Sequence, residues 1–210
     1  MPSPIPRLLI PLAVLSTLTA CAASPGPPPA ISLAGRSCVA AADLAAAKPV
    51  TLDAGKTVEV NLDDHAACLE PPGGPKSAYA AFQLPLSAEP YLVTVLSTPI
   101  GQGLFAPRLL VLDAQGATIR EIPKDSFTFH GAVLHAAIRA HADERYLIVA
   151  SDPASVGQTV SQLSEATQST LLCGPMLCSA YHSGSETSNT LTFAHNGSIT
   201  VSAQPVPKLN

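Results

Sequence analysis

The chain has 210 residues, of which 47 % are hydrophobic and only 12 % are charged, with a net charge of −4 at neutral pH. Charged residues are about half as frequent as the ~25 % of an ordinary globular domain, and no basic stripe is present, so nucleic acid is excluded as a partner. The 4 % of aromatic residues, with no tryptophan, argues against sugar stacking on exposed rings, whereas 21 prolines suit a β-rich extracytoplasmic protein.

Residues 1–20 have the organisation of a lipoprotein signal peptide. Arg7 provides a short positive region, and Leu8–Leu18 provides an apolar run. This run falls short of the ~20 apolar residues that span a bilayer. Leu18-Thr19-Ala20-Cys21 then forms a lipobox, in which Cys21 receives the lipid, palmitate included. The alternative is ordinary secretion with cleavage near Ala23 and a free Cys21.

The segment after the lipobox predicts a tether and a cellular location. Residues 21–36 contain Pro25-Gly26-Pro27-Pro28-Pro29 and no periodic apolar pattern, which indicates an extended, semi-rigid linker. Ala22 stands where an Asp would mark retention at the inner membrane. In a Gram-negative host we therefore expect a lipid-anchored protein on the periplasmic face of the outer membrane, with a single domain over residues 37–206.

Short strands dominate the pattern of this domain. The alanine-rich run Cys38–Lys48 is a short helical candidate, and Thr57–Leu62 alternates with period two, as a half-buried strand does. A loop follows over residues 71–75. Further strands are expected at Ala78–Leu84, Tyr91–Leu96, Arg108–Asp113 (covered on both faces), Thr118–Ile122, around Phe127 and Phe129, at Ala132–Ile138 and at Arg145–Ala150.

The last third of the chain predicts one helix and one hairpin. Asp152-Pro153 opens a helix with Val156, Val160 and Leu163 at helical spacing. Leu191–Phe193 and Ser198–Val201 flank Asn196-Gly197, a pair that suits a type I′ turn. The predicted fold is therefore mainly β, a single antiparallel, jelly-roll-like β-sandwich with one or two short helices.

Four cysteines remain once the lipid has taken Cys21. Three pairings are open to them, and in an oxidising compartment we expect the two local ones, Cys38–Cys68 and Cys173–Cys178. A zinc site made of Cys173, Cys178 and His182 is the alternative. It lacks a fourth ligand at a recognisable spacing, so no metal is expected.

Side chains that could support catalysis are sparse. There is no Gly-x-Ser-x-Gly elbow and no phosphate-binding or dinucleotide-binding loop. Asp63-Asp64-His65 are adjacent residues that point in different directions on a regular element, so a solvated loop is favoured over a metal site. His130, His135 and His141 lack the spacing of a metalloprotease helix. We expect neither an enzyme nor a cofactor.

Tyr181 is the aromatic residue that we expect to be exposed. It lies beside His182 and the Cys173–Cys178 turn, whereas Tyr91, Phe105 and Tyr146 adjoin the most apolar strands and are expected to be buried. Tyr181 is therefore the candidate ligand-binding residue.

Three segments resemble a known family. They are Phe105-Ala106-Pro107 leading into an apolar strand that ends at Asp113, then Asp125-Ser126-Phe127-Thr128-Phe129, then Tyr146-Leu147-Ile148-Val149. In this order they resemble the maltose-operon periplasmic protein family, over roughly residues 76–170. The lipobox and the Cys173/Cys178 pair look like features of a lipoprotein branch.

The resemblance implies a β-rich protein, periplasmic or membrane-anchored, that accompanies maltose and maltodextrin uptake, with no catalytic residues assigned. We therefore expect a non-enzymatic envelope lipoprotein that assists carbohydrate transport by contacting maltodextrins or a transport component. The alternative is a structural or protein-interaction lipoprotein of the outer membrane with no sugar ligand.

Overall fold

A computed structural model of the chain describes residues 30–87, 89–173 and 178–206. For residues 163–173, 178–179, 181–187 and 189 it describes the backbone alone. The predicted signal peptide, Cys21 and most of the predicted tether lie outside the described residues.

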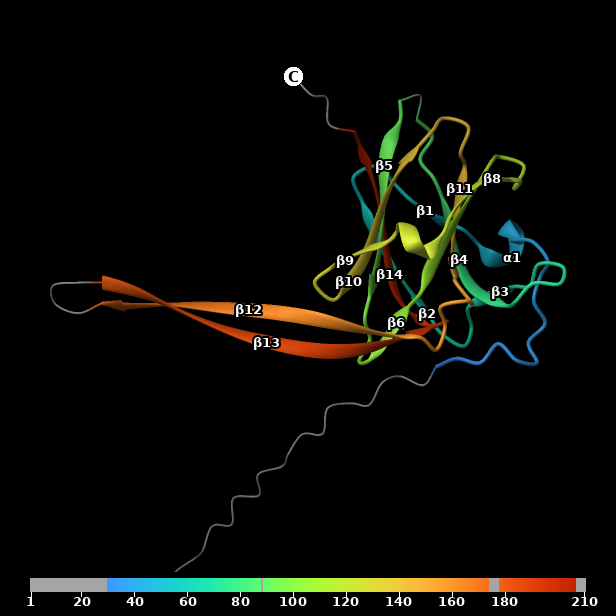
Figure 1. Ribbon diagram of the computed structural model, residues 1–210. Coiled ribbons are helices and arrows are strands. Elements are labelled where there is room, and N and C mark those ends of the chain that lie inside the picture. Colours follow the sequence, from blue (N-terminus) through green and yellow to red (C-terminus); the bar gives the residue numbers. More distant parts are fainter. Residues whose placement is uncertain (1–29, 88, 174–177, 207–210) are drawn as a thin grey trace, which may run out of the picture.

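Two β-sheets form the body of the molecule (Figure 1). The six-stranded sheet contains β1 (Val50–Thr51), β3 (Ala67–Leu69), β4 (Ser77–Gln83), β7 (Pro107–Leu112), β8 (Thr118–Ile122) and β11 (Tyr146–Ser151), in the order β1-β4-β11-β7-β8 with β3 also beside β4. The five-stranded sheet contains β2 (Thr57–Leu62), β5 (Tyr91–Thr98), β9 (Thr128–His130), β10 (Val133–Ala140) and β14 (Gly197–Pro205), in the order β2-β14-β5-β10-β9. All pairings in these two sheets are antiparallel except β1 with β4.

Strand alternation places the core between the two sheets. In β5 every second residue is buried, and Val93 and Val95 are fully inaccessible. They pack in one cluster with Leu147 of β11 and with Phe82 and Phe105, the largest fully buried side chains. Apolar side chains that leave one sheet face therefore meet those of the other, as expected for a sandwich. The predicted two-sheet, mainly β architecture is confirmed.

The six-stranded sheet also carries a second, smaller cluster on its opposite face. Ile148, Ala150 and Leu112 pack there with Tyr79, and Leu44 of the N-terminal region covers them. Coverage on both faces explains why β7 and β11 are almost continuously apolar in sequence. The strand prediction coincides with β2 and β8 and is displaced by one or two residues at the ends of most others.

The helix predicted over Cys38–Lys48 is wrong for most of its length. Only α1 (Leu44–Ala47) is helical, capped by the Asp43 carboxylate, which accepts the backbone N–H groups of Ala45 and Ala46 at 3.0 Å. The residues before it are held extended, because Val39 donates its N–H to the Cys68 carbonyl at 3.0 Å. No helix in the described ranges has the length and apolarity to cross a membrane.

A third sheet departs from the sandwich. It contains β6 (Gly103–Phe105), β12 (Thr159–Cys173) and β13 (Cys178–Ala194), with β12 and β13 paired in one antiparallel ribbon from Thr159–Thr192 to Cys173–Cys178. Figure 1 shows this ribbon running away from the body. We call β12 and β13 together the arm. Nothing in the sequence pattern predicted it.

The helix predicted from Asp152 is wrong, because a turn and then β12 follow. The Asp152 carboxylate accepts a hydrogen bond from the Ser155 hydroxyl at 2.5 Å, and the Asp152 carbonyl accepts one from the Ser155 N–H at 3.1 Å. These two bonds close a single turn, which does not continue into a helix. Gly157 has a φ of 85°, and its N–H donates to the Phe193 carbonyl at 2.8 Å. This left-handed residue redirects the backbone into the extended conformation.

The hairpin predicted around Asn196-Gly197 is also wrong. β13 pairs with β12 and β6, whereas β14 pairs with β2 and β5, so the chain passes from the third sheet to the five-stranded sheet at this point. Gly197 has a φ of 152°, and a Cβ there would lie 2.9 Å from the Cβ of Phe105. A glycine is needed here because the backbone passes close to Phe105 of the core, and not because the chain makes a tight turn.

We expect Gly197→Ala to lower the free energy of unfolding by about 1–3 kcal/mol, because the added methyl overpacks against a rigid core side chain. Gly73→Ala is the matched control, since Gly73 also has a positive φ (69°) but no atom within 4 Å of the added Cβ. Urea unfolding of chains beginning at Ala22 measures both. Equal losses for the two variants would contradict the packing explanation.

Candidate binding groove

The first described residues form an irregular segment, residues 30–38, that turns at Ala34-Gly35 and lies against one end of the sandwich. Ile31 donates its N–H to the Asn196 side-chain oxygen at 3.2 Å, and Leu33 is buried in the main core. Arg36 donates from Nη2 to the Ala66 carbonyl at 2.7 Å. Few backbone bonds hold this segment, so side chains and one covalent bond determine its position.

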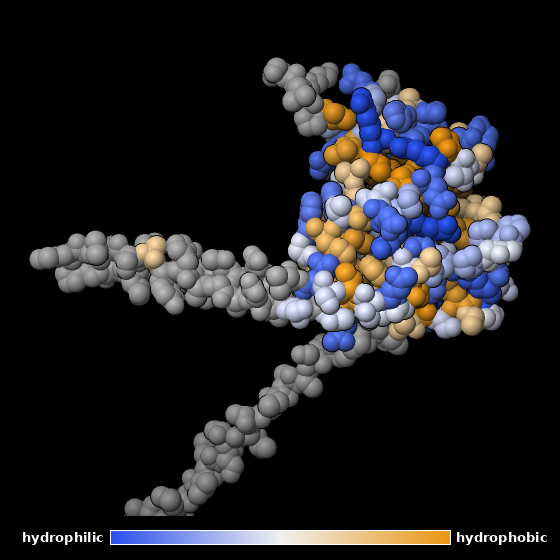
Figure 2. Space-filling model, in the orientation of Figure 1, coloured by the Kyte–Doolittle hydropathy of each residue, from blue (hydrophilic) through white to orange (hydrophobic). Residues whose placement is uncertain are grey.

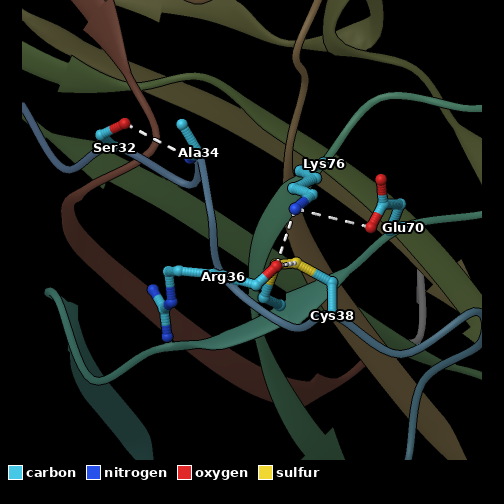
Figure 3. A network of polar contacts seen from close by, with 7 residues as sticks. Ser32, Ala34, Arg36, Cys38, Glu70 and Lys76 are labelled. Atoms are coloured by element: carbon cyan, nitrogen blue, oxygen red, sulfur yellow. Dashed lines mark hydrogen bonds and ion pairs between the residues drawn. A yellow bond between two sulfur atoms is a disulfide. The ribbon is translucent and has the colours of Figure 1, made fainter.

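Figure 3 shows the network that fastens residues 30–38. Cys38 forms a disulfide with Cys68 of β3, which confirms the first predicted pairing. Lys76 donates from Nζ to the Arg36 carbonyl at 2.7 Å and lies 3.6 Å from a carboxylate oxygen of Glu70. The Lys76 ammonium thus bridges the segment and the loop that precedes β4.

A groove runs along the end of the sandwich beside this segment. Its most enclosed cavity, which we call the main cavity, has a volume of about 350 Å³ and adjoins two larger, more open ones of about 510 and 500 Å³. Ala30 lines all three, and Ile100, Asn196 and Gly197 line both the main cavity and its acidic neighbour. The base of the arm forms one wall, because Thr192 and Phe193 of β13 line the main cavity.

Amide and hydroxyl groups are set into the otherwise apolar wall of the main cavity. Gln102, in the turn before β6, and Thr192 are exposed, while the Asn196 side chain is nearly buried. Phe193 is buried behind them, and the Lys124 ammonium lies 5.0 Å from the centroid of its ring. Neutral hydrogen-bonding groups on an apolar surface are the kind of lining that binds uncharged polar ligands.

The acidic flank of the groove comes from the turn between β2 and β3. Asp63 accepts the His65 N–H at 2.8 Å, and a carboxylate oxygen of Asp64 lies 3.6 Å from His65 Nε2. The side chains of Asp64 and His65 are 77 % and 87 % exposed, so this contact is solvated and contributes little to stability. The three residues form a turn, as the sequence favoured.

The opposite flank contains a hydrogen-bonded serine and histidine. Ser151 Oγ lies 2.7 Å from His195 Nδ1 and accepts the Ala78 N–H at 3.0 Å. Ser151 is fully buried, and burial lowers the pKa of His195 below its ordinary 6.5. His195 is therefore neutral at pH 7 and shares a hydrogen bond with the hydroxyl of a serine that no substrate can reach. The pair joins β11 to the chain between β13 and β14.

The other histidines singled out in the sequence lie elsewhere. His130 and His135 stack at the β9–β10 edge with centroids 4.8 Å apart. His141 lies in the turn after β10, where its N–H donates to a carboxylate oxygen of buried Glu144 at 3.0 Å. That carboxylate also pairs with Arg120 at 2.8 Å. Among the residues whose side chains are described, no three potential metal ligands come together.

The remaining predicted site residues fall on the arm. The backbone register places Cys173 opposite Cys178, Tyr181 opposite Thr170 and His182 opposite Ser169. Their side chains lie outside the described part, so the Cys173–Cys178 disulfide and a role for Tyr181 stay predictions. Tyr181 is eleven residues from Thr192 along β13, about 36 Å of extended chain, so the backbone does not bring it to the groove.

A second cavity, also of about 350 Å³, lies at the end of the sandwich where β14 finishes. Its lining includes three prolines, exposed Leu86 and Tyr91. Burial, reinforced by the Glu144 carboxylate, raises the pKa of Tyr91 to about 12. Its hydroxyl therefore stays protonated. Figure 2 shows apolar surface interrupted by hydrophilic side chains over the visible face of the body.

Sequence reasoning missed Gln102 and the groove role of Asn196. The Asn196-Gly197 pair drew attention only as a turn, and Gln102 stands between two glycines in a segment with no alternation. A polar residue between Gly101 and Gly103 is the one signal that could have marked the groove.

Residues 74–167 match the family model described as maltose operon periplasmic protein precursor, MalM. This stretch is therefore similar to the MalM family. The match covers somewhat less than half of the chain, from just before β4 into β12, and agrees with the extent of the resemblance seen in the sequence. It leaves out residues 30–38, β13 and β14. A comparison with curated proteins found no match.

The Ser151–His195 pair predicts a pH dependence of stability. Because the folded pKa of His195 lies below 6.5, the unfolded chain binds the extra proton first as pH falls. The stability that neutral His195 contributes is complete above pH ~6.5 and is lost as pH falls toward the folded pKa. Between pH 7 and 5 we expect His195→Asn, whose amide oxygen can replace Nδ1, to lose less stability than the parent chain.

Thermal unfolding at a series of pH values measures this difference. His65→Asn is the control for the loss of an exposed imidazole outside the Ser151–His195 pair. A parent-like slope in His195→Asn would contradict the assignment.

Proposed function

We propose that this protein is a non-enzymatic, lipid-anchored accessory of maltodextrin uptake at the periplasmic face of the outer membrane. The observation that carries the proposal is the similarity of residues 74–167 to the MalM family, since that family is described as a maltose operon periplasmic protein. The groove beside residues 30–38 is the proposed contact with the sugar.

The chemistry of the groove supports a neutral sugar as its ligand. Glucose chains offer hydroxyl groups, which pair with amides such as Gln102, and apolar ring faces, which pack on aliphatic wall residues such as Ile100 and Val156. The main cavity of about 350 Å³ falls at the lower end of the range for small-molecule sites. Continuation into the adjoining cavities fits a ligand of several sugar units.

The proposed anchor places the groove close to the membrane. Cys21 precedes Ala30 by nine residues, so an acyl chain on Cys21 would hold the groove end of the sandwich within about 30 Å of the bilayer surface. Palmitate and the other acyl chains would provide the binding energy.

Isothermal titration of the chain beginning at Ala22 with maltose through maltoheptaose tests the proposal. We expect saturable heat that strengthens with chain length, and a loss of at least about tenfold in affinity for Gln102→Ala, because one or two hydrogen bonds to the sugar disappear. Gln115→Ala, in an exposed turn on the other sheet, is the matched control.

Tyr181→Ala distinguishes the two candidate sites in the same titration. Loss of binding in Tyr181→Ala with full binding in Gln102→Ala would move the sugar site to the arm. Absence of heat across the whole series, with the protein folded, would contradict sugar binding. It would favour the second candidate, a protein-interaction lipoprotein, for which the projecting arm is the specific observation.

A further inference from the structure

The arm has a free edge along the whole of β12. In the third sheet β12 is the outermost strand, and its one partner among the described strands is β13. Fifteen residues of extended backbone therefore present alternate N–H and C=O groups on the other side, over about 50 Å. Mean strands are 5–6 residues long, so this edge is unusually large.

The sequence of β12 lacks the features that protect an edge. Natural edge strands are shortened, bulged or interrupted by proline and lysine. β12 contains neither proline nor glycine, no basic residue and one charge, Glu165. β8, the edge of the six-stranded sheet, illustrates the contrast, since it has five residues and carries both Arg120 and Glu121. The β12 edge is thus open to another strand.

Beyond its base, where Leu191 and Phe193 are buried in the main core, the sequence gives the arm no continuous apolar face to pack on another surface. Neither set of alternating residues in β12 is apolar: one contains Ser161, Glu165 and Ser169, and the other Gln162, Ser164 and Gln168. An isolated two-stranded ribbon is marginal in water. In addition, the register sets Glu165 directly opposite Glu186, a like-charge pair that weakens the middle of the ribbon. A third strand at the edge is the remaining source of stability.

We propose that the occupant of this edge is a second copy of the same chain, with β12 of each copy paired antiparallel across a two-fold axis. When the two strands overlap fully, Ala166 lies on the two-fold axis. Two residues then face each other across the axis when their numbers add up to 332, so that Thr159 faces Cys173 of the other copy. Glu165 then faces Thr167 of the other copy and not its own equivalent, so the lone charge is no obstacle. The four strands form one continuous sheet, β13-β12-β12-β13.

Three features favour β12 over β13 as the shared edge. β13 already pairs with β6 at Thr192–Ala194, it contains Gly184, and it carries His182 as well as Glu186. Closed two-fold dimers are also the commonest soluble assemblies, because one self-complementary surface makes the whole interface. The proposal does not depend on sugar binding.

Sedimentation of the chain beginning at Ala22 over a range of concentrations tests the assembly. We expect a reversible dimer, and a monomer when residues 164–187 are replaced by an Asn-Gly turn that joins the registered pair Leu163 and Ser188, with the thermal unfolding of the body unchanged. A monomer at every concentration would overturn the proposal. A dimer that survives removal of the arm would also overturn it, because the interface would then lie elsewhere.

A charge swap tests the register without shortening the arm. Ser164 of one copy faces Gln168 of the other, and within the arm these residues oppose the neutral Thr187 and Ser183. Ser164→Lys with Gln168→Lys should raise the dissociation constant about tenfold or more, since lysines then face lysines. Ser164→Lys with Gln168→Glu should restore the dimer. Equal dissociation constants for the two double variants would contradict the two-fold pairing.

Cross-linking locates the axis. Ala166→Cys should give a disulfide-linked dimer, because opposed residues of antiparallel strands are about 4.5–5.5 Å apart at Cα, within disulfide range. Among single cysteine variants at positions 162, 164, 166, 168 and 170, the yield of linked dimer should be highest at 166 and should fall with distance from it in both directions. Peptide mapping separates this bond from bonds to Cys173 or Cys178. Ile119→Cys on the β8 edge is the control and should remain monomeric.

Discussion

The covalent bond between Cys38 and Cys68 is the constraint on which the groove end of the molecule depends. Residues 30–38 contain no strand of a main sheet, so they contribute few backbone hydrogen bonds of their own. The disulfide joins this segment to β3, and the Lys76 ammonium and Arg36 guanidinium fasten it on either side. Besides these bonds, only the Ile31 N–H bond to Asn196 and the burial of Leu33 are described as holding Ala30 and Ile31 at the wall of the groove. The loop of about 30 residues that the disulfide closes makes it an effective constraint on the unfolded chain.

The sandwich and the arm are stabilised by different interactions. The sandwich obtains its stability from two apolar sheet faces that meet around Phe82 and Phe105. The arm has no apolar face and offers backbone hydrogen-bonding groups instead. Figure 1 shows that the first described residues and the arm leave the same end of the sandwich, whereas β14 ends at the other. With Cys21 acylated as proposed, the groove and the base of the arm would both lie on the membrane side.

Strands that alternate over a single core were predictable from the sequence, and β2 and β8 were placed to the residue. The errors share one physical cause. Local signals such as Asp152-Pro153 and Asn196-Gly197 were correct as markers of a change in chain direction, but tertiary pairing decided what followed them. Gly197 is required by the proximity of Phe105, a contact between residues 92 positions apart that no local pattern contains.

The candidate site was less predictable than the fold. The Cys38–Cys68 bond followed from the number and spacing of cysteines, whereas the groove is assembled from Ala30, Gln102 and Asn196, which are distant in sequence. The arm escaped prediction because its serine- and threonine-rich strands lack the apolar alternation that a core imposes. A ribbon that pairs through its backbone with another chain needs no apolar alternation, so its sequence does not show the pattern by which strands are predicted.

Hydrogen exchange of the chain beginning at Ala22, compared with its Cys38→Ser, Cys68→Ser variant, tests the central role of the disulfide most directly. We expect the variant to lose about 3 kcal/mol of stability. In the native state it should also lose protection at the Ile31 and Val39 amides, whose bonds run to Asn196 and Cys68. Protection in β5 and β11 should persist up to the limit set by global unfolding. Unchanged protection at Ile31 and Val39 would contradict the claim that this bond holds the groove together.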